Sequence, residues 1–277
     1  MKTHQILIAS YTKDFQWLHP NLLSLRKFCE GFLPPVISVD EGDYGEAKRL
    51  LARVGWPEVS LVMKNGRRGQ GFMRAQISMM ECDLLCPNAD FIYLVGSDCL
   101  AHRRFAPDMY FVEDKPVMLY NSRKYFEDAG AGAPLEWINS TQEILGFPVN
   151  GEFMRRLPIH YPRELFAPMR AHVEATHRMN FEDYIYQRNA AGRPVSESNI
   201  LGGFAWEKMH DLYYWMHADG HAAYTDYRAN NPDPLAQFWS HGGLDRPCET
   251  TAIVNGRICA GRPPREIINE VLGPCWQ

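Results

Sequence analysis

Long apolar segments are missing from this sequence of 277 residues. A membrane-spanning helix needs roughly 18 or more consecutive apolar residues, and no run of that length occurs. The N-terminal segment Met1–Ser10 also has too short an apolar part for a secretory signal peptide. We therefore expect a protein without stable membrane insertion, and we assign it to the cytoplasm.

An excess of positive charge is also missing. The chain has 29 Lys and Arg against 33 Asp and Glu, which gives a net charge of −4. Proteins that attract nucleic acids or anionic membranes through their overall field are usually basic, so this balance argues against such partners. A local basic patch at Arg103–Arg104 or Arg155–Arg156 is still compatible with binding of phosphates.

Paired cysteine motifs are the third absence. Cys82 and Cys86 are four residues apart and can share one helix face, but no second pair completes a zinc site. We expect reduced, mostly buried thiols, as is usual in the cytoplasm. The seven cysteines are Cys29, Cys82, Cys86, Cys99, Cys248, Cys259 and Cys275.

The first third of the chain alternates apolar runs with amphipathic segments. Runs typical of buried strands occur at 5–10, 36–39 and 59–63. Between them, apolar residues recur with the helical period at 18–29 and 46–54. This alternation predicts an α/β fold with a mostly parallel sheet, in one large domain or two closely joined ones.

The same two patterns continue along the chain. Helices are expected over 73–84, over a segment that includes residues 173–184, and over 267–272. Further strands are expected at 91–95 and 116–120. The first of these runs is apolar throughout, which is typical of a strand buried on both faces.

Two stretches carry weaker signals. Residues 100–109 are interpreted as a loop or a short helix. Gly130, Gly132 and Pro134 lie within residues 121–147, and they favour a long, mobile loop there. Composition alone does not indicate what such a loop would do.

The apolar run 91–95 stops at Gly96-Ser97-Asp98. In open α/β sheets, ligands bind beyond the carboxyl ends of the strands, so a carboxylate here is well placed for a metal ion or a sugar hydroxyl. Serine and aspartate also form ordinary turns by bonding their own backbone. The tripeptide alone therefore fits a turn and a binding site equally well.

A basic, glycine-rich connector, Lys64–Gly71, precedes the helix expected at 73–84. Gly69 and Gly71 would allow backbone amides to approach phosphate oxygens, and Arg67 and Arg68 would supply positive charge. A solvated turn is the simpler interpretation of the glycines. The two arginines before a helix are also compatible with a diphosphate site.

A further helix start is marked by Ser196, Ser198 or Asn199, any of which can cap a helix. Glu197 lies in or just before the first turn, where it can simply complement the helix dipole, a contribution of about 0.3–1 kcal/mol. The pair Gly202-Gly203 indicates that something approaches the backbone closely.

The last third of the chain contains His241, which follows Phe238 and Trp239 and precedes two glycines. Imidazole is a common metal ligand, and glycines allow amides to point at an anion. A single histidine is more often structural than ligating, so these residues by themselves favour a structural role.

In their order, these motifs resemble those of GT-A-type glycosyltransferases, in particular glycosyltransferase-like proteins of bacteria and phages. The resemblance covers about Ile6 to His241 and implies a GT-A-like, Rossmann-type mixed sheet flanked by helices. It implies a nucleotide-sugar-binding half at 1–125 and an acceptor-side half at 126–277 of one compact domain. The motifs are Ser10-Tyr11, Gly-Phe-Met-Arg-Ala-Gln76, Phe91–Asp98, Ser196–Asn199 with Trp206, and Trp239–His241.

The resemblance implies a nucleoside-diphosphate sugar as donor, with Mn²⁺ or Mg²⁺ bridging its diphosphate. The family's Asp-x-Asp motif falls on Gly96-Ser97-Asp98, where glycine replaces the first aspartate. Asp98 and His241 would hold the cation, and Glu197 would act as general base or sugar ligand. The other residues implied in donor binding are Ser10, Tyr11, Asp14, Arg68, Gln76 and Ser97.

The acceptor would be a hydroxyl of a glycan, a lipid-linked glycan or a modified base in phage DNA. An inverting enzyme needs a carboxylate that takes the acceptor proton, whereas a retaining enzyme does not, and the sequence leaves both open. Two other functions use similar residues. One is a nucleotidyltransferase that acts on a nucleoside triphosphate; the other is a non-catalytic nucleotide-sugar-binding protein, which the missing first aspartate favours.

Overall fold

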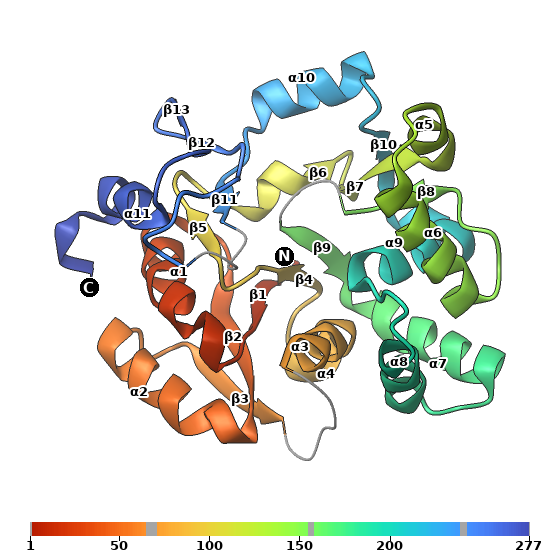
Figure 1. Ribbon diagram of the computed structural model, residues 1–277, viewed down its shortest axis with the longest axis horizontal. Helices are drawn as coiled ribbons and strands as arrows, with labels where there is room; N and C mark the ends of the chain where they lie inside the picture. Colours follow the sequence, from red (N-terminus) through yellow and green to blue (C-terminus); the bar gives the residue numbers. More distant parts are fainter. Residues whose placement is uncertain (1, 65–70, 155–157, 239–242, 277) are drawn as a thin grey trace.

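The computed structural model describes residues 2–64, 71–154, 158–238 and 243–276. Its central sheet has five strands in the order β3-β2-β1-β4-β9 (Figure 1). Strands β3, β2, β1 and β4 run parallel to one another, and β9 is antiparallel to β4. The strands are β1 (His4–Ala9), β2 (Leu33–Asp40), β3 (Ser60–Lys64), β4 (Phe91–Leu94) and β9 (Ile159–Pro162). The predicted α/β fold with a mixed, mostly parallel sheet flanked by helices is confirmed.

Helices cover both faces of this sheet (Figure 1). Ile6 and Ile8 of β1 belong to the core cluster that includes α1 and α2, whereas Leu7 belongs to the cluster that includes α3, α7, α8 and α9. Successive side chains of a strand point to opposite faces, so β1 is buried on both sides. All four residues of β4 are buried as well, as its apolar run predicts. The helices are α1 (Phe15–Phe28), α2 (Tyr44–Val54), α3 (Gly71–Met80), α7 (Phe166–His177), α8 (Phe181–Ala190) and α9 (Glu197–Lys208).

Smaller sheets join the two halves of the chain. Strands β10, β7 and β6 form one sheet, β8 pairs with β7, and β11 pairs with β5. Since β9 and β11 follow residue 126 and pair with β4 and β5, the halves 1–125 and 126–277 share sheets. These strands are β5 (Cys99–Ala101), β6 (Phe111–Val112), β7 (Lys115–Ser122), β8 (Gly151–Glu152), β10 (Tyr214–His217), β11 (Leu235–Gln237), β12 (Ile253–Val254) and β13 (Arg257–Ile258).

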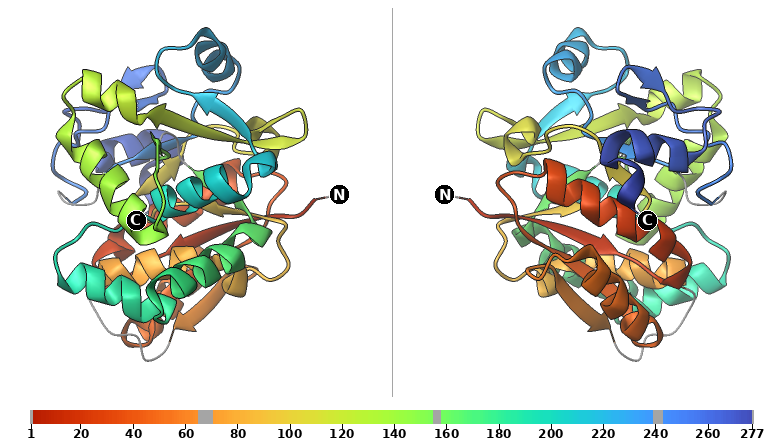
Figure 2. Two further views of the ribbon diagram at one scale, coloured as in Figure 1. Left: turned by 90° about the vertical axis from the view of Figure 1, so that its right-hand side faces the viewer. Right: turned by 90° about the vertical axis from the view of Figure 1, so that its left-hand side faces the viewer.

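Four of the remaining helices lie around the smaller sheets, whereas α4 lies beside α3 and α7. Figure 2 shows α10 at one end of the molecule, above β7 and β10, with α2 and β3 at the opposite end. The predicted closing amphipathic helix is confirmed as α11, which buries Ile267, Ile268 and Val271. These helices are α4 (Cys82–Leu85), α5 (Arg123–Asp128), α6 (Gly132–Leu145), α10 (Ala222–Asn230) and α11 (Pro264–Leu272).

The prediction of a long loop at 121–147 is wrong, because most of this segment forms helices α5 and α6. The Ser122 hydroxyl caps α5 by accepting from the Tyr125 backbone N–H. Gly130 and Gly146 adopt left-handed backbone conformations just after the two helices, with φ of 64° and 71°. The glycines therefore mark helix ends rather than a loop, which is a common use of glycine.

Three other predicted elements differ in extent. The helix expected at 73–84 is divided into α3 and α4 at Glu81, whose side chain forms a buried ion pair with Lys64 at 2.7 Å. The helix expected over 173–184 is divided into α7 and α8, because Arg178 ends α7 in a left-handed conformation and Asn180 caps α8. Residues 100–109 contain strand β5 in addition to a short 3₁₀ helix.

The close approach predicted at Gly202-Gly203 is confirmed, and the approaching group is the protein's own core. A Cβ atom on Gly202 would lie 2.4 Å from Cγ of Phe153, and one on Gly203 would lie 3.1 Å from Leu145. The backbone of α9 therefore packs directly against the Phe153 ring at Gly202, where no side chain intervenes.

Replacing Gly202 by alanine is expected to lower the free energy of unfolding by about 1–3 kcal/mol, because the new methyl group overlaps the Phe153 ring. Urea unfolding would measure the change. Gly132→Ala is the matched control, since no atom lies within 4 Å of its added methyl group. Equal stability of the two variants would contradict this packing.

Candidate functional site

The order in which strands are added to the central sheet reverses at β1. Strand β1 has β2 on one side and β4 on the other, and ligands of open α/β sheets bind at the carboxyl edge of such a point. Ser10 follows β1 and Ser97 follows β4, and both are buried. The Ser97 hydroxyl donates to the Ser10 hydroxyl at 2.9 Å. Two residues that the sequence associates with the donor therefore meet at this edge.

Tyr11 and Asp14 belong to the same edge. A short 3₁₀ helix, Thr12–Asp14, follows Tyr11 and leads into α1. Burial raises the pKa of the Tyr11 hydroxyl, and the nearby carboxylates of Asp14 and Asp98 raise it further. The structure therefore brings Tyr11, Asp14 and Asp98 together, although 84 positions separate the two aspartates in the sequence.

The Tyr11 ring also explains the glycine that begins α3. A Cβ atom on Gly71 would lie 3.1 Å from two atoms of that ring. The close approach to Gly71 is thus made by a side chain of the protein, and Gly71 itself begins a helix. Gly69, Arg67 and Arg68 lie outside the described residues.

Asp98 is positioned by residues on both sides of it. A Cβ atom on Gly96 would lie 2.7 Å from Oδ1 of Asp98, so this carboxylate folds back over the glycine. The Gln237 side chain donates to the same oxygen at 3.4 Å, and the Phe238 backbone N–H donates to the Asp98 carbonyl at 3.0 Å. Glycine at position 96 therefore leaves space for the Asp98 carboxylate, because any side chain at this position would displace that of Asp98.

Gln237 is a site residue that the sequence did not indicate. It reaches Asp98 because β11 pairs with β5, and Gln237 lies opposite Cys99 in that register. The signal that could have indicated Gln237 is its position directly before Phe238-Trp239, the aromatic pair that precedes His241.

The residues at this edge can be compared with the needs of a divalent cation. Within the described residues, no group of three or more His, Cys, Asp or Glu side chains is suited to a metal ion. Mg²⁺ is often held by only one or two carboxylates, with substrate phosphates and water as its other ligands. Asp98 fits such a site, in which the diphosphate would complete the coordination. His241 lies outside the described residues.

Glu197 begins helix α9, and Ser196 is confirmed as its cap by accepting from the Asn199 backbone N–H at 3.3 Å. The Glu197 backbone N–H donates to the side-chain oxygen of Gln76 at 3.1 Å. The Ser198 hydroxyl donates to the Glu197 carboxylate at 3.0 Å. Gln76, which the sequence associates with the donor, therefore lies against the start of α9.

Burial raises the pKa of Glu197, and the hydrogen bonds to its carboxylate only partly oppose this effect. Tyr161 of β9 lies nearby, since the charge of Glu197 adds to the burial that raises the pKa of this tyrosine. Glu152 of β8 acts on Tyr161 in the same direction. A raised pKa makes a carboxylate a stronger base, which is the direction that general-base catalysis requires.

The described site residues thus form two groups. Ser10, Tyr11, Asp14, Ser97 and Asp98 gather at the carboxyl edge of β1 and β4, and Gln76 and Glu197 gather where α3 meets α9. The edge group consists mainly of hydroxyls and carboxylates. It can bind sugar or ribose hydroxyls and can supply oxygen ligands to a cation.

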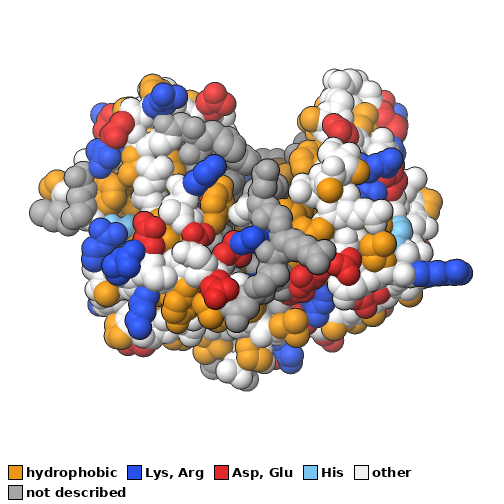
Figure 3. Space-filling view, turned by 60° about the horizontal axis from the view of Figure 1, so that its bottom comes forward, with side chains coloured by type: hydrophobic (Ala, Val, Ile, Leu, Met, Phe, Trp, Pro, Cys, Tyr) orange, Lys and Arg blue, Asp and Glu red, His pale blue; other side chains and the backbone are white. Residues whose placement is uncertain are grey.

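Two described arginines that could bind phosphates form ion pairs with carboxylates of the protein. Arg74 forms an ion pair with Asp40 at 3.0 Å, at the end of β2. Arg104, one of the expected basic patch, is held by Glu30 and Asp108, both at 3.0 Å. The other expected patch, Arg155–Arg156, lies outside the described residues. Acidic and basic side chains are mixed over the described part of the face in Figure 3.

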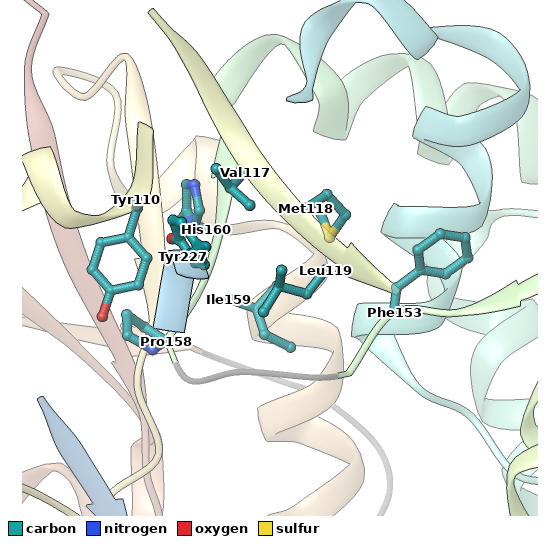
Figure 4. Close-up of a pocket in the computed structure, with 9 residues that line it drawn as sticks. All are labelled: Tyr110, Val117, Met118, Leu119, Phe153, Pro158, Ile159, His160 and Tyr227. Carbon is teal, nitrogen blue, oxygen red and sulfur yellow. The ribbon is translucent and has the colours of Figure 1, made fainter. Parts of the chain in front are cut away.

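A separate small cavity lies between β7 and β9 (Figure 4). Val117, Leu119 and Ile159 line it together with His160 and Tyr227. The Tyr227 hydroxyl donates to the Met109 carbonyl at 2.8 Å. Its nine described lining residues include neither lysine nor arginine, so the cavity does not have the chemistry of a phosphate site.

In comparisons with known proteins, no family model matches this chain, and no curated protein matches its sequence. The described helices include none that is long and apolar enough to cross a membrane.

Glu197→Gln is expected to change how stability depends on pH. Because the folded-state pKa of Glu197 is raised, the folded protein holds this proton more tightly than the unfolded chain. The stability of the wild type should therefore fall, relative to the variant, as pH rises above the usual glutamate value of about 4.3. Urea unfolding between acidic and neutral pH measures the difference.

Glu136→Gln, which removes an exposed carboxylate, corrects this comparison for the change in net charge. After that correction, Glu197→Gln should gain stability over the wild type as pH rises and should match it at the acidic end. A difference that is largest at acidic pH would contradict the raised pKa.

Proposed function

We propose that this protein is a GT-A-type glycosyltransferase that moves a sugar from a nucleoside-diphosphate sugar to an acceptor hydroxyl. One observation carries the proposal. The hydroxyls and carboxylates that follow β1 and β4 converge at the carboxyl edge of the sheet, where Ser97 bonds Ser10 and Asp98 lies beside Tyr11. The resemblance of the sequence motifs to such enzymes supports the same conclusion.

In this proposal the edge group binds the donor. Tyr11, whose ring rests on Gly71, offers an aromatic face and a hydroxyl to the nucleoside. Asp14 and Ser97 offer acceptors and a donor for its hydroxyls. Asp98, held by Gln237, is the carboxylate for a divalent cation. Such a cation would neutralise charge on the departing diphosphate.

Glu197 is proposed as the general base of an inverting reaction. A base must be able to take a proton near the working pH, and burial raises the pKa of Glu197 in that direction. The Ser198 hydroxyl and the position of Glu197 at the start of α9 fix its carboxylate. In a retaining reaction, Glu197 would only orient the sugar.

A glycan or lipid-linked glycan is the favoured acceptor. Binding of a DNA backbone requires free positive charge, and the ion pairs with Glu30 and Asp108 neutralise the charge of Arg104. The net charge of −4 supports the same preference.

The donor can be identified with a thermal-shift screen of nucleoside-diphosphate sugars, with and without Mn²⁺. A ligand that binds only the folded state raises its stability, by about 2.7 kcal/mol at 100 times the dissociation constant. We expect one nucleotide sugar to raise the unfolding temperature, and Mn²⁺ to enlarge the effect. Release of pyrophosphate from a nucleoside triphosphate would instead identify a nucleotidyltransferase. Binding without turnover, over a range of acceptors, would identify a non-catalytic binding protein.

Asp98→Ala is expected to abolish sugar transfer and the Mn²⁺-dependent part of donor binding, while the fold stays intact. Gly96→Ala should weaken the same two quantities, because the added methyl group displaces the Asp98 carboxylate. Transfer assays and isothermal titration would measure both effects. Asp128→Ala, which removes an exposed carboxylate paired with Lys124, is the control and should leave transfer unchanged. Full activity of Asp98→Ala would contradict the proposed cation site.

A further inference from the structure

Two histidines lie side by side in the loop that joins β10 to α10. His217 is the last residue of β10, and His221 directly precedes the first residue of α10. Their ring centroids are 5.0 Å apart and their planes are inclined by 47°. The His217 side chain is 37% exposed and His221 is exposed, so solutes can reach both rings.

A buried carboxylate stands behind the first of these rings. The Asp219 side chain is only 10% exposed, and its Oδ2 accepts from the Ser122 hydroxyl at 2.8 Å and from the Ser122 backbone N–H at 3.2 Å. The same oxygen lies 3.5 Å from Nδ1 of His217. Metal-binding histidines commonly direct their second ring nitrogen at such a carboxylate, which fixes the ring and its tautomer.

We propose that His217 and His221 together bind a nitrogen-preferring dication such as Zn²⁺, Ni²⁺ or Cu²⁺, with Asp219 as the positioning residue for His217. With Zn–N bonds of about 2.1 Å and a roughly tetrahedral angle, two imidazole centroids on one ion lie about 5 Å apart. The observed 5.0 Å separation matches this value.

The proposed site is open and differs from the one at Asp98. No third His, Cys, Asp or Glu in the described part of the chain completes a metal group, so water would occupy the other positions. Its ligands are imidazoles, which suit zinc, copper and nickel, whereas Asp98 offers oxygen, which suits magnesium and manganese. The inference does not depend on the proposed glycosyl transfer.

Other described histidines and thiols are poorer ligands. Nε2 of His172 and of His177 contacts the backbone carbonyl of Leu145 or Ile144, at 2.8 and 2.7 Å. Burial raises the pKa of the Cys82 and Cys99 thiols well above its ordinary value. A metal binds the thiolate, so these sulfurs are hard to recruit.

A bound ion would join the end of β10 to the start of α10. Helix α10 is fixed at its other end by Tyr227, whose hydroxyl donates to the Met109 carbonyl at 2.8 Å. An ion at His217 and His221 would therefore restrain both ends of the helix. The thermal stability of the protein should then rise with metal concentration.

Zn²⁺ binding to the full chain without an affinity tag, measured in competition with a chromophoric chelator, tests the proposal. His217→Ala and His221→Ala should each weaken the affinity at least tenfold, and Asp219→Asn should weaken it about 10- to 100-fold. His210→Ala removes an exposed histidine whose Nδ1 already contacts the Trp206 carbonyl, and this control should bind as the wild type does.

Electron paramagnetic resonance of the Cu²⁺-loaded protein gives a second readout. We expect coupling to two imidazole nitrogens in the wild type and to one in each single histidine variant. Urea unfolding of the metal-free variants checks that they fold; if an alanine variant does not fold, the glutamine variant of the same histidine replaces it. Unchanged affinity and unchanged nitrogen coupling in the folded single histidine variants would overturn the proposal.

Discussion

The parallel pairing of β1 with β4 is the constraint on which the rest of the structure depends. Both strands are covered by helices on the two faces of the sheet, so most of their side chains are apolar and their backbone groups bond each other. Polar chemistry is therefore confined to the strand ends. Ser10 and Ser97 meet there although they are 87 positions apart in the sequence. The same pairing brings Asp98 to Tyr11 and Asp14.

Elements with a strong local signal could be predicted from the sequence. The apolar runs of β1, β2 and β4, the helical period of α1 and the Ser196 cap of α9 are each carried by residues only a few positions apart in the sequence. The sequence of residues 121–147 predicts a loop although this segment forms α5 and α6, because glycine occurs both in loops and at helix ends. The distinction depends on φ, which the sequence does not contain.

The candidate site was predictable only in part, for a related reason. Ser97 and Asp98 follow an apolar run, which is a local signal, and the structure confirms that this run is a buried strand. Gln237 reaches Asp98 only because β11 lies beside β5, and a pairing over more than 130 residues leaves no local pattern. The antiparallel addition of β9 to the sheet is equally non-local.

Three glycines share a physical role that the sequence alone suggested only loosely. Gly71 accommodates the Tyr11 ring, Gly96 the Asp98 carboxylate and Gly202 the Phe153 ring. A missing side chain in a sequence suggests room for a ligand. In each of these cases, a side chain from elsewhere in the chain occupies that room, and two of the three lie at the candidate site.

The position of β9 has a consequence for how the chain can be divided. A sheet edge with unpaired N–H and C=O groups is a template for pairing with other molecules. Strand β9, which comes from the second half of the chain, covers the edge that β4 would otherwise present. A fragment that ended near residue 125 would keep the donor-side residues but expose this edge, and it would be prone to self-association. The second half of the chain thus protects the first from aggregation.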